Sequence, residues 1–220
     1  METLEHVVLE PVLHLEPVPY TPCDRRRPLP QDAPEVWGRY WRDCLADSGL
    51  RDLTTLGPGS WEVPVRSLGR RQDLEKIMSI ELRRYSPLSV GSDPSLGGGL
   101  VLLDNHRVII EFGSGGILAS HREWLAAARC TASRWEEILI GQATLPVRFV
   151  DGWLEFSAPD DSRAPAPDYR VRPVDLKAAV LESVAELEKF SARVLEVLRT
   201  WPGLKEVEAL ARHLAGLGEK

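Results

Sequence analysis

The chain has 220 residues, of which 43% are hydrophobic and 27% are charged, and its formal net charge is −6. This composition predicts a folded protein, and the excess of acids argues against a nucleic-acid-binding protein. The three cysteines are scattered, and no apolar run approaches the roughly 20 residues that span a bilayer. We therefore expect a cytoplasmic protein with no disulfide framework, no membrane contact and no cofactor.

Residues 1–31 are predicted to be a proline-rich N-terminal arm. Each proline removes a hydrogen-bond donor and keeps the preceding residue extended, which excludes a helix. The short apolar segments at residues 6–9 and 12–15 are typical of edge strands or of an extended strap over the body. The basic run Arg25-Arg26-Arg27 favours a solvated turn over a phosphate site.

Two helices in the body of the chain are expected to begin at capping boxes. Asp32 with Glu35 predicts a helix over residues 32–49, and Ser120 with Glu123 predicts a short helix that contains Trp124. A further helix is expected over residues 73–85, because its apolar residues recur on one face.

Strands are expected between these helices. Residues 61–66 alternate like a strand that Pro64 confines to an edge. Residues 100–103 and 107–112 predict a hairpin of central strands, and residues 146–150 and 153–156 predict a second hairpin around Asp151-Gly152. The apolar segment 135–140 fits a helix or a strand equally, and residues 159–167 predict an exposed, mobile loop.

The C-terminal quarter predicts one helix of about seven turns over residues 176–201, a break at Pro202-Gly203 and a shorter helix to residue 217. The chain therefore predicts an α+β fold, with an antiparallel sheet near residues 61–173 flanked by helices. The organisation expected is the arm at 1–31, an α+β core at 32–173 and a C-terminal helical pair at 174–220, packed on the core or projecting from it.

Candidate chemistry gathers near one loop, residues 113–116. His106, Glu111 and His121 are residue types that bind zinc, and Ser114 offers a hydroxyl. The glycines of the loop lack both the Lys-Ser/Thr pair of a P-loop and the Gly-x-Ser-x-Gly of a hydrolase elbow. A metal-dependent or serine hydrolase around residues 106–121 is therefore kept as an alternative function.

The middle of the chain resembles a group of bacterial proteins in which a glycine-led hairpin runs into a loop, a short Trp-containing helix, a second hairpin and a long C-terminal helix. The resemblance rests on residues 98–111, 115–118, 123–124, 135–141 and 146–147, about a third of the chain. It implies a small, acidic, single-domain protein of the kind that acts as an immunity or accessory partner of bacterial toxins and defence systems. That group commonly has paired cysteines and an aspartate in the loop, where this chain has residues 113–117, so no role of those residues carries over.

Our leading hypothesis is thus a non-enzymatic protein-binding module, an immunity-like or accessory protein of a bacterial toxin or defence system. Its partner would be a protein more basic than itself, because opposite charges speed association. The residues expected at such a surface are the acids Asp160, Asp161, Glu182 and Glu186, with Trp201 as an apolar anchor. A second alternative is a structural subunit that forms a homo-oligomer through its C-terminal helices.

Overall fold

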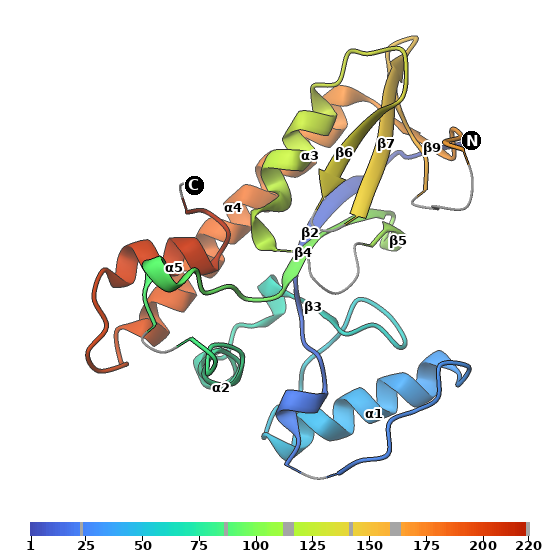
Figure 1. Cartoon of the computed structure of the whole chain (residues 1–220). Helices are drawn as coiled ribbons and strands as arrows, with labels where there is room; N and C mark the ends of the chain where they lie inside the picture. Colours follow the sequence, from blue (N-terminus) through green and yellow to red (C-terminus); the bar gives the residue numbers. More distant parts are fainter. Residues whose placement is uncertain (23, 86–87, 112–116, 141–142, 159–163, 219–220) are drawn as a thin grey trace.

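The computed structural model describes residues 1–22, 24–85, 88–111, 117–140, 143–158 and 164–218. Within these ranges the chain is an α+β protein with two sheets, as its sequence predicts in class (Figure 1). The α-helices are α1 (Pro34–Asp47), α2 (Arg71–Glu81), α3 (His121–Ala128), α4 (Pro173–Leu198) and α5 (Val207–Leu214).

The first sheet is five-stranded, in the order β1-β9-β8-β7-β6. Its strands are antiparallel except for the parallel pair β1 and β9. The hairpin expected around Asp151-Gly152 is confirmed as β7 and β8, and segment 135–140 proves to be the strand β6. The bounds are β1 (Glu2–Thr3), β6 (Glu136–Ile140), β7 (Ala143–Val150), β8 (Trp153–Phe156) and β9 (Tyr169–Val171).

The second sheet is four-stranded and antiparallel, in the order β3-β2-β4-β5. The hairpin expected near residue 105 is confirmed as β4 and β5, with both Asn105 and His106 at positive φ in its turn. Of these two strands only β4 is central, because β5 forms an edge of the sheet. The bounds are β2 (Val7–His14), β3 (Glu62–Pro64), β4 (Gly98–Asp104) and β5 (Arg107–Ile110).

The expectation of edge strands or a strap for the N-terminal arm is wrong, because β2 lies inside the sheet between β3 and β4. Pro11 is tolerated there because β3 pairs only with residues Val12, Leu13 and His14. At Pro11 one side of β2 therefore has no neighbouring strand that needs an N–H donor. The expectation of a single sheet within residues 61–173 is wrong for the same reason, since residues 2–14 supply a strand to each sheet.

Neither capping box forms as expected. The residue before a proline is held extended, so Ala33 caps α1, and the Asp32 carboxylate accepts the N–H of Leu29 instead, at 2.7 Å. Before α3, a 3₁₀ turn over Leu118–Ser120 runs directly into the helix. Ser120 therefore has helical backbone angles and makes no capping hydrogen bond.

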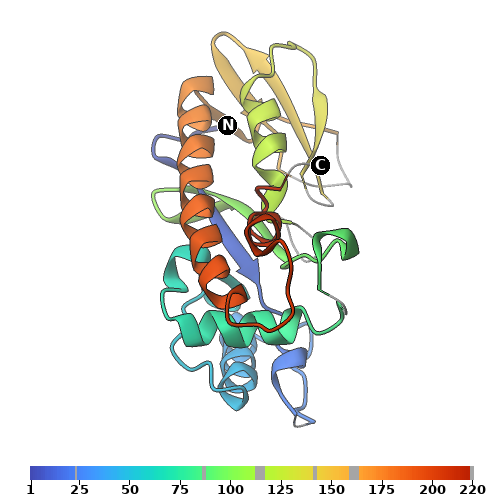
Figure 2. The same ribbon diagram turned by 90° about the vertical axis from the view of Figure 1, so that its left-hand side faces the viewer.

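The helix α4 links the two hydrophobic cores. Leu176, Ala179 and Val180, in its N-terminal half, pack in the core of the five-stranded sheet. Residues of its C-terminal half, including Phe190 and Val194, pack in a second core with α1, α2 and α5. Figure 2 shows α4, in orange to red, running along most of the molecule with α3 at its side. The helices thus cover one side of β2 and β4, and the opposite face carries a small apolar cluster of Val12, Val101 and Leu103, against which Leu56 packs.

Candidate functional site: a histidine–carboxylate cluster

The candidate site lies on the face of the four-stranded sheet that is turned away from α4. His14 ends β2 and Glu62 begins β3, and the two residues are direct partners in the antiparallel ladder. Side chains of paired residues project from the same face of a sheet. The backbone register therefore places an imidazole beside a carboxylate, although the residues are 48 positions apart in sequence.

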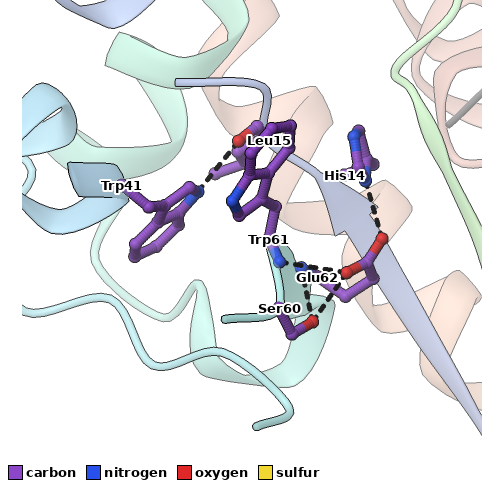
Figure 3. A network of polar contacts seen from close by, with 6 residues as sticks. All are labelled: His14, Leu15, Trp41, Ser60, Trp61 and Glu62. Carbon is purple, nitrogen blue, oxygen red and sulfur yellow. Dashed lines mark hydrogen bonds and ion pairs between the residues drawn. The ribbon is translucent and has the colours of Figure 1, made fainter. Parts of the chain in front are cut away.

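The carboxylate of Glu62 is fully engaged (Figure 3). Its Oε1 lies 2.6 Å from Nδ1 of His14, and its Oε2 accepts the hydroxyl of Ser60 at 2.6 Å and the N–H of Trp61 at 3.1 Å. The side chain of Glu62 is only 5% exposed, whereas that of His14 is 18% exposed. The arrangement fixes the imidazole by one nitrogen, as a carboxylate does in many histidine-dependent sites.

Aromatic side chains pack beside the cluster and hold its backbone in place. The ring of Trp61 lies 5.6 Å from that of His14, between centroids. The indole N–H of Trp41 on α1 donates to the carbonyl of Leu15 at 2.9 Å, and the N–H of Leu15 donates to the carbonyl of Trp61 at 3.1 Å. These bonds fasten α1 and the start of β3 to the end of β2, so the position of His14 is fixed by the packing around it (Figure 3).

A second carboxyl group, that of Glu111, completes the cluster. Glu111 directly follows β5. The residue as a whole is exposed, but its carboxyl group lies near Glu62 and is partly buried. Burial, the hydrogen bond to Glu62 and the charge of Glu62 together raise the pKa of Glu111 to about 7. Two neighbouring carboxyl groups do not both ionise easily, so Glu111 loses its proton only at a higher pH than an ordinary glutamate does.

The same contacts shift the pKa values of Glu62 and His14. Burial alone would raise the pKa of Glu62, but hydrogen bonds from His14, Ser60 and Glu111 outweigh it and hold the pKa at about 2. The hydrogen bond to Glu62 raises the pKa of His14 above its ordinary value, despite partial burial. The cluster thus favours an ionised Glu62 and the charged form of His14, and Glu111 titrates near neutral pH. The hydroxyl of Ser60 donates to Glu62, so it is not activated by the histidine.

Of the residues expected around the mid-chain loop, the structure brings only Glu111 into this cluster. His106 is exposed in the turn before β5, at the opposite end of that strand from Glu111, and His121 is the first residue of α3. Ser114 lies outside the described residues. Across the described part of the chain, no three His, Cys, Asp or Glu side chains are grouped so as to hold a metal ion. The alternative with a zinc ion between residues 106 and 121 therefore finds no geometric support.

Of the residues expected to form an acidic docking surface, the structure describes Glu182, Glu186 and Trp201. Asp160 and Asp161 lie outside the described residues. Glu182 is exposed on α4, but Glu186 is bridged to Lys189 at 3.2 Å and to Arg193 at 3.1 Å. Trp201 follows the end of α4 and packs, partly buried, against the core that contains α5.

Sequence reasoning missed His14, Ser60 and Glu62. The available signal was the position of two polar residues: His14 comes at the end of one apolar segment, and Glu62 comes at the start of another. Periodicity shows that such segments are strands, but it does not show which strands pair or in which register. The site arises from that pairing.

No described helix is both long enough and apolar enough to cross a bilayer. No protein-family model matches the chain, and neither a curated protein nor a solved structure is similar enough to count as a match.

Proposed function

We propose that the cluster of His14, Glu62 and Glu111 is an acid–base centre that moves a proton to or from a small substrate bound beside Glu111. The observation that carries the proposal is the buried contact of Glu62 with His14, at 2.6 Å, beside Glu111, where the pKa of Glu62 is held at about 2 and that of Glu111 is raised to about 7. Titratable neighbours with separated pKa values are the usual basis of acid and base roles at neutral pH.

Each residue has a distinct part in this proposal. Glu111 is the exposed member, so it is the group that meets the substrate and exchanges the proton. Glu62 stays ionised and orients His14 through Nδ1, and it favours the charged form of the imidazole. The reactions this arrangement suits are those that need proton transfer without a protein nucleophile, such as hydrolysis by water or enolisation.

The direct test is a titration of the side-chain carboxyl carbons by NMR, with the imidazole followed in parallel. We expect Glu111 to titrate near pH 7 and His14 above its ordinary value, and both to move toward ordinary values in Glu62→Gln. The exposed Glu137→Gln, on β6, is the matched control. A Glu111 that titrates as an ordinary glutamate would refute the proposal.

A measurement of catalysis follows from the same residues. Chromogenic esters, phosphoesters and glycosides are tested with the wild type, Glu111→Gln and the control Glu137→Gln. General acid–base groups contribute about 10²–10⁴-fold to a rate, so we expect a loss of that order in Glu111→Gln alone. Equal turnover by the wild type and Glu111→Gln would mean that the activity does not come from this cluster.

Protein binding remains a second candidate, as a cytoplasmic immunity-like or accessory module for a more basic partner. It is favoured by two large apolar side chains on the outer surface of α4, where Val174 is 65% exposed and Leu181 is 58% exposed, with the acidic Glu182 beside them. Helical spacing puts Val174 and Leu181 on one face. Static light scattering of the wild type and of the double variant Val174→Ser, Leu181→Ser separates self-association from a surface kept for another protein. An assembly larger than a monomer that the double variant loses favours the homo-oligomer.

A further inference from the structure

A second acidic position is Glu10, in the middle of β2, on the same face of the four-stranded sheet as His14 and Glu62. It pairs with Val101 of β4 in the ladder, and its other flank lies beyond the end of β3. Its side chain is only 4% exposed. Glu10 lies four residues before His14 on the same strand, which separates their Cα atoms by about 13 Å. It is therefore a separate position from the acid–base cluster.

The carboxylate of Glu10 is only half satisfied. Its Oε2 lies 3.1 Å from Nη2 of Arg66, which follows β3. Its Oε1 is buried and has no hydrogen-bond partner among the described residues. A buried polar atom without a partner costs about 1–3 kcal/mol, so natural proteins rarely leave one. Burial raises the pKa of Glu10, and Arg66 only partly opposes it.

Glu10 also lines a hollow in the surface. The hollow has a volume of about 340 Å³, and the turn between β4 and β5 forms part of its wall. Its lining combines two apolar side chains, Val8 and Leu103, with polar ones, which suits a ligand with an alkyl stem and a polar end. The other lining residues are His6, Val8, Arg66, Leu103, Asn105 and His106.

We propose that this hollow binds a guanidinium or primary ammonium group, which donates hydrogen bonds to Oε1 of Glu10 while its alkyl stem lies against Val8 and Leu103. The free carboxylate oxygen requires a donor, and an anion would be repelled by Glu10. The charge of Glu186, which also acts on Glu10, favours a cation as well. A metal ion does not fit, because the described His and acidic residues here form no group of three ligands.

Arg66 is the group that makes way for the ligand. Its side chain is 62% exposed, and its ion pair with Glu10 uses a single nitrogen. Because Glu10 is buried, its carboxylate needs a cationic partner, and the incoming cation supplies one when Arg66 turns to the solvent. A guanidinium or ammonium group thereby reaches Oε1 without a change in the strands. The hollow is not lined by His14, Glu62 or Glu111. This site and the acid–base centre can therefore be tested independently.

The test uses NMR of the intact protein, with the methyl groups of Val8 and Leu103 as reporters. The probes are agmatine, cadaverine and an arginine-containing peptide, with butylurea as an uncharged control. We expect saturable shifts with the charged probes and at least a tenfold loss of affinity in Glu10→Gln, and no loss in the exposed Glu16→Gln. Binding of agmatine points to a free small molecule, whereas binding of the peptide alone points to the side chain of a protein partner.

A second variant guards against a folding defect in Glu10→Gln. His106 is exposed in the turn at a φ of 67°, a conformation that asparagine tolerates, so His106→Asn alters the wall of the hollow without straining the turn. We expect it to weaken probe binding at least threefold with an unchanged amide spectrum. Absence of saturable binding up to about 10 mM of every charged probe would overturn the proposal. Equal binding by Glu10→Gln, or a crystal structure with only a water molecule on Oε1 after soaking with agmatine, would overturn it as well.

Discussion

His14 and Glu62 are opposite one another in the ladder of β2 and β3, and their side chains meet at 2.6 Å as a direct result of that register. A shift of β3 by one residue would turn Glu62 to the other face of the sheet and put Val63, now fully buried, in its place. The polar cluster and the hydrophobic core therefore depend on the same register, and the core enforces the position of the cluster.

Replacing Glu62 by glutamine should destabilise the protein by about 2 kcal/mol, because the change removes a charge-assisted hydrogen bond to His14 and places a poorer acceptor before Ser60 and Trp61. Urea unfolding at neutral pH measures the loss. Glu137→Gln, on the exposed part of β6, is the matched control and should change the unfolding free energy little. A Glu62→Gln protein as stable as that control would show that the cluster does not support the fold.

The stability of the protein should fall between about pH 4.5 and pH 7 through Glu111. Its pKa is about 7 in the folded chain against an ordinary value of 4.5, so the folded state binds more protons over this interval. Stability then decreases as the pH rises. In Glu111→Gln this contribution disappears, and the unfolding free energy should fall less steeply over the same interval.

Part of the decrease in unfolding free energy with rising pH should remain in Glu111→Gln, because burial also raises the pKa values of Glu10 and Glu81. Glu62 acts with the opposite sign, since its pKa is lowered to about 2 and its stabilisation is lost only in acid, below about pH 4.5. Chemical unfolding at a series of pH values separates these contributions. An identical pH dependence in the wild type and in Glu111→Gln would contradict the assignment.

Replacing Trp41 by phenylalanine should cost more than the same change at Trp37. The indole of Trp41 is buried and its N–H donates to Leu15, so the variant loses this bond and leaves a buried carbonyl without that donor, at about 1–3 kcal/mol. The indole of Trp37 donates to Leu29 in an exposed position, where water replaces it. Thermal unfolding of the two variants gives the comparison, and equal losses would mean that the Trp41 bond does not tie α1 to β2.

Replacing Gly98 by alanine should destabilise the protein by about 3 kcal/mol or more, because the new Cβ would overlap the backbone carbonyl of Val12 on the neighbouring strand. The next residue is a natural control, since a Cβ on Gly99 meets no atom within 4 Å. Denaturant unfolding of both variants shows whether β2 and β4 are as close at Gly98 as the structure has them. A Gly98→Ala protein as stable as Gly99→Ala would contradict this close approach.

The local signals in the sequence predict most of the elements well. Turn residues mark both hairpins, and the three- and four-residue spacing of apolar side chains marks α4 and α5, because these signals depend on neighbours along the chain. The position of β2 was not predictable in this way. Pro11 argues against an interior strand. It is accommodated because the pairing of β3 with β2 stops at Val12, one residue before Pro11 would need a donor.

The candidate site was predicted only through Glu111, and for a different partner set. His14, Ser60 and Glu62 are ordinary polar residues in their own segments, and they gain unusual properties only from pairing between distant parts of the chain. The pKa of Glu111 likewise depends on Glu62, 49 positions away in the sequence, and not on the histidines near it.

The contacts of α4 have a consequence for how the molecule comes apart. One half of the helix belongs to each core, and the first two strands of the chain are divided between the two sheets. Wherever the polypeptide is cut between β2 and α4, each fragment lacks a strand or a helix that its sheet requires. Heat should consequently melt the protein in one cooperative transition, and neither sheet should fold when expressed without the other.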